Sequence, residues 1–354
     1  EADYGRYPKG VVYAMRAMDS WLYDESPYKH FEYNETFKVL KEGVEKGYFE
    51  ELISKYLLNN NHSTLLILKP DKEIQGKKDE EVLRKLKTYK ESLSHEEQLK
   101  LIEDTLALEE FQNEKEKKED LETIPILEIE DINKEIESLF ADEKDINNVK
   151  WLRNICFTNN IVYSQLDFDT KKVPYSLVPY IGLLTSILGK MDTENYEYGD
   201  LTTEVNINTG GIAFNANVYG VNDEIDVFRP KFELSGKCFS DKVPKLYELF
   251  HEIIFKTKVI DKKRLGEIIS ETKSRLGMSL SSNGHITSAN RSESYFSKAA
   301  VYRELISGIS FYEFLEKCDS KFEELADEII ENLNEIVHII FRPENLVIGT
   351  TCDK

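Results

Sequence analysis

A stretch of unusually high charge divides this 354-residue chain. Of the 50 residues from 71 to 120, 27 are charged (16 acidic and 11 basic), and Gly76 is the only glycine. Burying so many unpaired charges would cost more free energy than a domain gains on folding, so this stretch cannot enter a hydrophobic core. The length of the chain allows two or three domains, and the charged stretch separates them.

Helical periodicity runs through residues 81–91 and 94–118 of this stretch. Leu99, Ile102 and Leu106 form a narrow apolar stripe, and Ser94 with Glu97 three residues later predicts a capping box at the second helix. Two interpretations are open at this point. The segment is either a solvated helix or a helical hairpin that joins two larger bodies.

The residues before this stretch predict three helices and one strand. The helical patterns cover residues 8–20, 34–46 and 49–58. An apolar run at residues 62–70 ends in a proline and predicts a buried strand. Three helices and a single strand cannot make a complete core, so these residues are expected to end an α+β unit. The chain begins with Glu1 and has no basic and apolar leader, and we expect it to be a piece from inside a longer protein.

Residues 124–354 predict a whole α+β domain. The strands are expected at residues 149–156, 161–169, 204–208, 211–219, 231–239 and 345–351, with the first two paired as a hairpin. Residues 174–190 predict a helix so apolar that it is buried on more than one side. Further helices are expected at residues 245–256, 261–280, 294–306 and 320–340, the last with a capping box at Ser320 and Glu323. This order indicates an antiparallel sheet with helices packed on one face.

Charge and cysteine spacing exclude several classes of protein. Acidic residues number 66 against 46 basic residues, and this charge of −20 disfavours binding to nucleic acid. No apolar run approaches the roughly 20 residues of a membrane span. The four cysteines lie far apart without a C-x-x-C pair, which argues against a zinc ribbon or a disulfide framework. They indicate a cytoplasmic or other reducing compartment, with Cys156, Cys238, Cys318 and Cys352 as small apolar residues.

The histidines do not form a metal site in the sequence. His251-Glu252 begins like the zinc motif H-E-x-x-H, but the fifth residue is Phe255, so the second imidazole is absent. The inverted spacing H-x-x-E-H fails at every histidine of the chain, namely His30, His62, His95, His251, His285 and His338.

Other catalytic signatures are absent from the sequence as well. It contains no G-x-S-x-G elbow, no Walker loop and no G-x-G-x-x-G. Gly210-Gly211 is interpreted as a turn before a strand, and residues 282–285, with His285, as a loop between helices. The sequence therefore predicts no catalytic, cofactor-binding or metal-binding residue in this chain.

A series of short motifs extends in a fixed order over nearly the whole chain. They are Trp21-Leu22-Tyr23-Asp24 with Pro27, Tyr48-Phe49-Glu50 followed by Leu52-Ile53, Leu57-Leu58, Asn60-x-His62 and Lys69-Pro70-Asp71, Gln112 followed by Leu121, Ile124-Pro125-Ile126-Leu127 and Asp131-Ile132, Thr209-Gly210-Gly211, and Ser282-x-Gly284-His285. Taken together, these motifs resemble the presequence protease branch of the insulinase (pitrilysin-like) zinc metallopeptidase family.

The resemblance implies a clamshell of two halves, each built from two related α+β domains and joined by a helical hairpin. Residues 1–72 would be the C-terminal part of one such domain, 73–123 the charged hairpin linker, and 124–354 a non-catalytic insulinase-like domain. The resemblance places the zinc ligands and the catalytic base upstream of residue 1. It places an Arg and a Tyr that complete the site beyond Lys354. No catalytic element can be carried onto this chain, and zinc is expected in the intact enzyme alone.

One segment tests this reading from within the sequence. In the catalytic domain of the family, the zinc motif lies on the first helix after the opening strands. The equivalent residues 174–190 contain no His, Asp or Glu. We therefore expect a non-catalytic repeat of the same fold.

The leading hypothesis is the non-catalytic central portion of a zinc-dependent metalloendopeptidase that degrades short unstructured peptides inside a closed two-half chamber. Its partners would be peptide substrates and the catalytic and C-terminal domains of the same polypeptide, with neither nucleic acid nor membrane. The alternative is a naturally non-catalytic partner subunit or a peptide-binding scaffold of the insulinase type. An H-x-x-E-H motif encoded upstream of Glu1 would favour the first hypothesis, and its absence the second.

Overall fold

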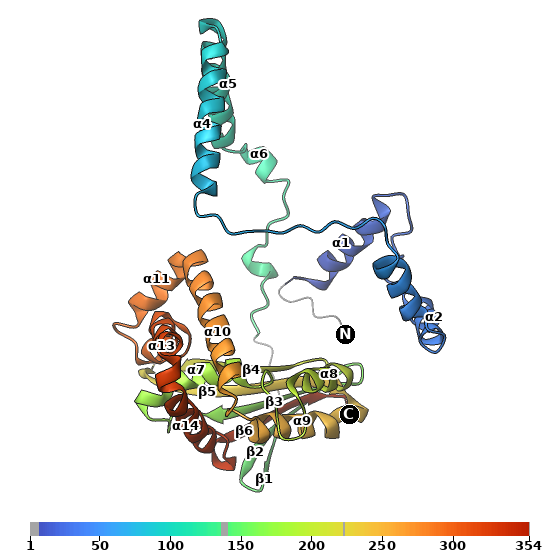
Figure 1. Cartoon of the computed structure of the whole chain (residues 1–354), viewed down its shortest axis with the longest axis vertical. Coiled ribbons are helices and arrows are strands. Elements are labelled where there is room, and N and C mark those ends of the chain that lie inside the picture. Colours follow the sequence, from blue (N-terminus) through green and yellow to red (C-terminus); the bar gives the residue numbers. More distant parts are fainter. Residues whose placement is uncertain (1–6, 136–140, 222–223, 354) are drawn as a thin grey trace. The chain divides into compact units, whose positions relative to one another are not determined.

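The computed structural model of the chain describes residues 7–135, 141–221 and 224–353. The chain divides into two compact units, Glu1–Ile136 and Glu137–Lys354. The first contains helices and extended segments, and the second contains a six-stranded sheet with its helices (Figure 1).

The described part of the first unit is built from helices. They are α1 (Lys9–Trp21), α2 (Asn34–Val44), α3 (Tyr48–Ile53) with a π-helical turn at Ser54–Leu58, α4 (Ile74–Ser92), α5 (His95–Asn113) and α6 (Lys118–Leu121). Ser20 is the only buried side chain among residues 7–135, and its hydroxyl donates to the carbonyl of Ser26 at 2.8 Å. This unit therefore has no hydrophobic core within the described residues.

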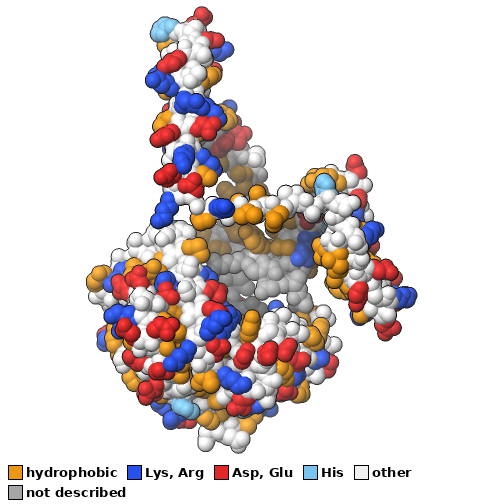
Figure 2. Space-filling model, in the orientation of Figure 1, with side chains coloured by type: hydrophobic (Ala, Val, Ile, Leu, Met, Phe, Trp, Pro, Cys, Tyr) orange, Lys and Arg blue, Asp and Glu red, His pale blue; other side chains and the backbone are white. Residues whose placement is uncertain are grey.

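Helices α4 and α5 form a hairpin that turns at Leu93. The predicted capping box is confirmed, because the backbone N–H of Glu97 donates to Ser94 Oγ at 3.2 Å and the N–H of Ser94 donates to Glu97 Oε2 at 2.8 Å. Charged side chains of both signs alternate along the hairpin (Figure 2), and ion pairs one turn apart include Lys85 with Glu81 at 2.8 Å. The sequence placed the start of the first helix at residue 81, and the structure extends it back to Ile74.

The prediction of a buried strand at residues 62–70 is wrong. This segment has no regular secondary structure, and Leu65, Leu66, Ile67 and Leu68 are all largely exposed. A strand needs a neighbour that satisfies its backbone groups, and residues 7–135 contain no other strand to provide one. The apolar sequence alone could not supply that neighbour.

The second unit is organised around one sheet in the order β1-β2-β6-β3-β5-β4. All neighbouring pairs are antiparallel except β2 with β6, which is parallel. The strands are β1 (Asp142–Ile146), β2 (Val149–Ile155), β3 (Ile161–Asp169), β4 (Ile212–Val221), β5 (Glu224–Phe239) and β6 (Leu346–Cys352). The predicted α+β class is confirmed. The sequence missed β1 and the first half of β5.

The predicted hairpin between residues 149–156 and 161–169 is wrong, because β6 lies between β2 and β3. The link between the two strands crosses the end of β6. There, Asp353 accepts hydrogen bonds from the backbone N–H groups of Thr158 (2.9 Å) and Asn160 (2.6 Å). A short turn fits either a hairpin or an intervening strand, and the contact with Asp353, 193 residues away from Asn160, selects the second.

Helices cover one face of this sheet. They are α7 (Val178–Ile187), α8 (Tyr198–Asn208), α9 (Val243–Lys256), α10 (Lys262–Ser282), α11 (Gly284–Glu293), α12 (Lys298–Ser307), α13 (Ile309–Ser320) and α14 (Phe322–Ile340). Two predictions are corrected here. Residues 204–208 end helix α8 and are not a strand, and Ser320 ends α13 and does not cap α14. The second error arose because α13 was missed, so that the end of one helix was taken for the start of the next.

The core lies between the sheet and helix α7. This helix packs against β4 and also against α10, α12, α13 and α14, which agrees with the prediction that it is buried on more than one side. Ile181, Leu184 and Leu188 are buried as predicted. Phe232 and Leu234 of β5 face them from the sheet, fully removed from water. The opposite face of the sheet, which we call the open face, carries the polar residues of the same strands.

Candidate functional site

The open face of the sheet holds a cluster of hydrogen-bonded polar side chains. Asp167 of β3 lies directly opposite Glu233 of β5 in the antiparallel register. Glu233 accepts hydrogen bonds from Asn217 Nδ2 at 2.8 Å and from the hydroxyl of Tyr219 at 2.5 Å, both on β4. Asp167 accepts from Gln165 Nε2 at 2.8 Å. Two carboxylates are thus held side by side, with Glu233 buried and Asp167 half-buried.

These contacts set the protonation of the cluster. Burial raises the pKa of Asp167, Gln165 partly offsets the rise, and the charge of Glu233 adds to it. The hydrogen bond to Glu233 raises the pKa of Tyr219 to about 12, so its hydroxyl remains a donor at neutral pH. The cluster can accept hydrogen bonds from N–H donors of a ligand. It contains no nucleophile paired with a base among its described residues.

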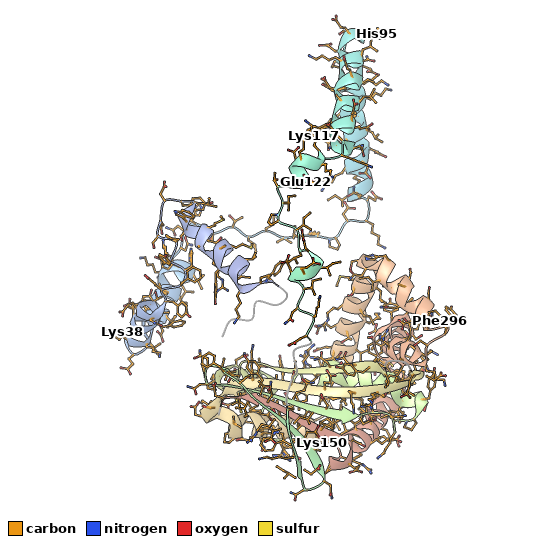
Figure 3. All side chains as sticks on the ribbon, turned by 180° about the vertical axis from the view of Figure 1, so that it is seen from behind. Lys38, His95, Lys117, Glu122, Lys150 and Phe296 are labelled. Carbon is orange, nitrogen blue, oxygen red and sulfur yellow. The ribbon has the colours of Figure 1, made fainter. Side chains whose placement is uncertain are left out.

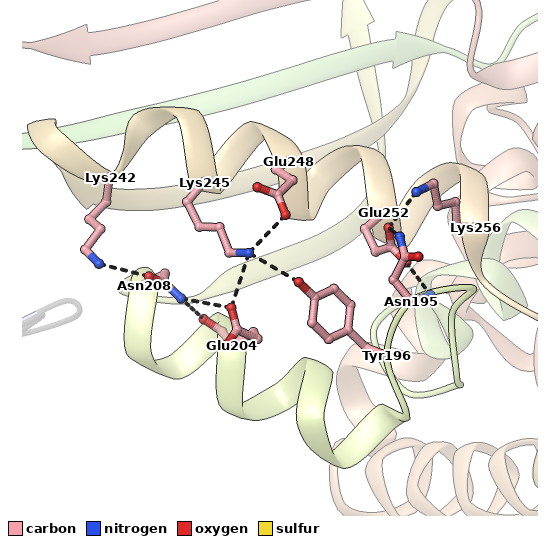
Figure 4. Close-up of polar contacts among 9 residues, drawn as sticks. All are labelled: Asn195, Tyr196, Glu204, Asn208, Lys242, Lys245, Glu248, Glu252 and Lys256. Atoms are coloured by element: carbon pink, nitrogen blue, oxygen red, sulfur yellow. Dashed lines mark hydrogen bonds and ion pairs between the residues drawn. The ribbon is translucent and has the colours of Figure 1, made fainter.

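A second polar network joins helices α8 and α9 (Figure 4). Lys245 Nζ lies 3.0 Å from a carboxylate oxygen of Glu248 and 3.3 Å from one of Glu204, and it donates to the hydroxyl of Tyr196 at 3.2 Å. The hydrogen bond with Glu248 is the largest of the interactions that raise the pKa of Lys245. Because this ammonium group has three partners, the network explains helix packing and leaves no reactive group for chemistry.

The incomplete zinc motif of α9 contains a structural carboxylate. Glu252 is 3% exposed and accepts hydrogen bonds from the backbone N–H (3.1 Å) and side-chain amide (2.8 Å) of Asn195, and Lys256 Nζ lies 3.1 Å away (Figure 4). Burial raises the pKa of Glu252, but hydrogen bonds with Thr193, Asn195 and Lys256 outweigh it and hold the pKa at about 2. Glu252 therefore ties the segment before α8 to α9.

All six histidines are exposed, and they lie in separate segments of the chain. His95 is at the tip of the hairpin (Figure 3), and the ring of His251 lies 5.1 Å from that of Phe255. Across residues 7–135, 141–221 and 224–353, no group of three or more His, Cys, Asp or Glu side chains could hold a metal ion. Within the same residues, no helix combines the length and apolar character needed to cross a membrane.

Comparison with known proteins places this fold in a family. Residues 68–318 match the family described as Peptidase M-16C associated. The chain belongs to this family. The match agrees with the resemblance to presequence proteases that the ordered motifs indicated.

Relatives of this peptidase-associated chain are longer than the chain itself. Protein HypA of Clostridium perfringens is 39% identical over 99% of the chain and 36% of the relative. Presequence protease 1, chloroplastic/mitochondrial, of Arabidopsis thaliana is 27% identical over 100% of the chain and 33% of the relative. The crystal structure of a conserved protein from Enterococcus faecalis V583 matches 60% of the chain at 14% identity, with a TM-score of 0.44. The chain spans about a third of the length of the curated relatives it matches.

Two landmarks of the peptidase-associated region can now be located. The turn interpretation of Gly210-Gly211 is confirmed, because Gly210 N–H donates to the carbonyl of Lys237 at 2.7 Å and Gly211 has a φ of +116°, a conformation that favours glycine. The loop interpretation of residues 282–285 is wrong. Only Asn283 separates α10 from α11, and His285 lies in the first turn of α11.

Sequence reasoning missed the cluster on the open face. A signal was present, because Gln165 and Asp167 occupy alternate positions of one predicted strand and Glu233 occupies the matching phase of another. The pairing of Asp167 with Glu233 depends on the register of β3 with β5, which the sequence does not state.

Proposed function

We propose that this chain is the non-catalytic central portion of a zinc-dependent metalloendopeptidase that degrades short unstructured peptides inside a closed two-half chamber. The family match over residues 68–318 and the relatives named presequence protease support a role in a peptidase. One structural observation, the surroundings of helix α7, carries the non-catalytic part of the proposal.

Helix α7 is the first α-helix after strands β1 to β3, the place where the resemblance expects a zinc motif in a catalytic domain. It contains no His, Asp or Glu, and Leu183, Leu184 and Ile187 are fully or almost fully buried. Because zinc is held by imidazole, thiolate or carboxylate groups, this helix cannot supply its ligands. The described residues do not fit a zinc ion, and we assign no zinc-dependent step to them. Helix α7 supports the sheet by packing alone.

We further propose three parts with distinct roles. Residues 1–72 would complete a preceding α+β domain, residues 73–123 would act as the hinge, and residues 124–354 would form part of the chamber wall. A helical hairpin between two halves can transmit opening and closing, and closure excludes water from a reaction. The outer charges of α4 and α5 and their exposed leucines are compatible with an element that packs on other parts of a larger protein.

The alternative of a peptide-binding scaffold has one observation in its favour. Asp167 and Glu233 present carboxylate oxygens on an open sheet face, where backbone N–H groups of an extended peptide could donate to them. The two proposals differ in whether the intact protein cleaves the peptide that it binds.

Metal analysis and a peptidase assay on this chain and on the full-length protein would test the proposal. We expect chelator-sensitive cleavage of short peptides and about one zinc per molecule for the full-length protein, and neither for the 354-residue chain. Tightly held zinc with peptidase activity in the chain alone would contradict the proposal. A full-length protein that binds peptides but does not cleave them would favour the scaffold.

The hinge role requires a separate experiment in the full-length protein. Replacing Leu99 and Leu106 with glutamine should loosen the packing of α5 and change turnover while zinc content stays constant. Replacing Lys100, a charged residue on the same helix, with glutamine is the control. Unchanged kinetics in the double variant would remove the basis for the hinge.

A further inference from the structure

A groove opens on the helical side of the second unit, where α7, α9 and α14 end. Its floor is apolar and consists of Leu184, Leu188, Ile254, Val259 and Phe341, each 7% exposed or less. The groove has a volume of about 560 Å³, which falls within the range of small-molecule sites. It is separate from the polar cluster of the open face, because the groove lies on the opposite side of the sheet.

The rim of the groove differs in charge from the rest of the chain. Its charged or titratable side chains are Arg342 and His338, and none of the described residues that line it is Asp or Glu. This contrasts with an overall excess of 20 acidic residues. The nearest described carboxylate to the guanidinium is Glu344, outside the lining, at 3.7 Å from Nη1 of Arg342. The rim is therefore complementary to an anion.

The guanidinium of Arg342 has N–H donors available for such an anion. Its Nε donates to the carbonyl of His338 at 2.7 Å, which positions the group beside the last turn of α14. An arginine has five N–H donors in all, and the planar group matches the geometry of a carboxylate. The side chain is 55% exposed, so a ligand can reach it from solvent.

The helix ends around the groove would favour a cation if their carbonyls were free. Two of these carbonyls already have donors in the structure. The hydroxyl of Thr257 donates to Ile253 at 2.5 Å at the end of α9, and Arg342 donates to His338 at the end of α14. Arg342 thus leaves the rim with positive charge.

We propose that this groove binds an aliphatic carboxylate, with the alkyl chain on the apolar floor and the carboxylate on Arg342. Each methylene removed from water strengthens binding by about fourfold, so the alkyl chain supplies most of the affinity. The carboxylate pairs with the guanidinium and fixes the direction in which the chain enters. This inference does not depend on the proposed peptidase function.

Three ten-carbon probes distinguish the chemistry of the head group. Decanoate, 1-decanol and decylammonium would be titrated into the 354-residue chain below their aggregation limits, with isothermal titration calorimetry as the readout. We expect decanoate to bind at least tenfold more tightly than decanol and decylammonium to bind most weakly. Equal affinities for decanoate and decanol, tighter binding of decylammonium, or no binding of decanoate would overturn the proposal.

Variants then locate the site. Val337→Trp fills the groove from the half-buried wall of α14 and should weaken decanoate and decanol by tenfold or more. Arg342→Gln should weaken decanoate about tenfold and leave decanol unchanged, and Arg342→Lys should restore most of the loss.

Matched controls guard against binding to the exposed apolar side chains of the first unit. Val82→Trp on α4 and Arg275→Gln on α10 change the same residue types outside the groove lining and should leave all three affinities unchanged. If Val337→Trp does not fold, the Arg342 pair decides, because a decanoate affinity that is insensitive to Arg342→Gln contradicts the site. Equal losses in the control variants would also contradict it.

Discussion

Helices α5 and α7 both carry runs of leucine and isoleucine, yet their surroundings are opposite. In α7, seven of ten residues are buried, between the sheet and four other helices. In α5, none of the 19 residues is buried, although it contains four leucines, an isoleucine and a phenylalanine. The comparison shows that apolar residues at helical spacing predict a helix, whereas burial requires a second surface.

The arrangement of the apolar residues explains the difference further. At 100° per residue, Leu99, Ile102 and Leu106 of α5 fall on one face, and Leu101 and Leu108 fall on the opposite face. One partner helix can cover only one of these faces. Helix α5 therefore depends on its capping box and helix propensity, while α7 depends on tertiary packing.

The largest predicted effect comes from placing a carboxylate on each helix. Leu184→Asp buries a charge without a partner in α7 and should cost several kcal/mol, a large part of the stability of a domain. Leu99→Asp on the exposed face of α5 should cost less than about 0.5 kcal/mol. Chemical denaturation followed by Trp151 fluorescence in a Trp21→Phe background, and by circular dichroism, measures both. A small effect of Leu184→Asp would show that α7 is solvated.

Adding one methyl group to a glycine of each unit sharpens the same comparison. In Gly182→Ala the new Cβ would lie 2.2 Å from the carbonyl oxygen of Ile306 and 3.0 Å from the ring of Phe311, so overpacking should cost about 1–3 kcal/mol. In Gly76→Ala on α4 the new Cβ meets nothing within 4 Å and should stabilise the helix by about 0.5–1 kcal/mol. Opposite signs are thus expected in thermal unfolding. A gain in both variants would mean that α7 can move away from α12.

Removing the capping serine tests whether α5 relies on local interactions. Ser94→Ala deletes the acceptor of the Glu97 N–H and should cost about 1 kcal/mol of helix stability, seen as faster amide hydrogen exchange in the first turn of α5. Ser320→Ala removes only a hydroxyl that donates to Lys317 at the end of α13, and it should change stability by less than about 0.5 kcal/mol. Equal effects would contradict the assignment of Ser94 as the cap.

The smallest effect concerns the paired carboxylates of the open face. Because burial raises the pKa of Asp167, the folded state favours its protonated form, and stability falls as pH rises from the unfolded pKa through the folded pKa. Asp167→Asn should therefore stabilise the protein at pH 7 by on the order of 0.5 kcal/mol, and the gain should vanish in acid.

Asp353→Asn is the control of opposite sign. The backbone N–H groups of Thr158 and Asn160 lower the pKa of Asp353, so its contribution to stability is present above the unfolded pKa and is lost as pH falls through the folded pKa. Asp353→Asn should thus destabilise the protein at pH 7 and not in strong acid. Unfolding midpoints across pH for both variants measure the two trends, and parallel trends would refute the assignments.

The sequence by itself determined the elements whose signals are local. The two hairpin helices and their cap at Ser94, the apolar helix at residues 174–190 and the α+β class follow from periodicity and capping within a few residues. The absence of a zinc motif at the six histidines is also a property of the sequence. The ordered motifs pointed to the family that the match over residues 68–318 shows.

Only the tertiary structure decided the features that depend on distant residues. Strand β6 separates β2 from β3 because Asp353 reaches Thr158 and Asn160, and no local pattern encodes that contact. The register of β3 with β5 brings Asp167 beside Glu233, and the ends of three helices create the groove at Arg342. Local patterns fix backbone conformation within a few residues, whereas strand order and burial follow from which surfaces meet. That is why the exposed run at residues 62–70 has the composition of a strand without a sheet to join.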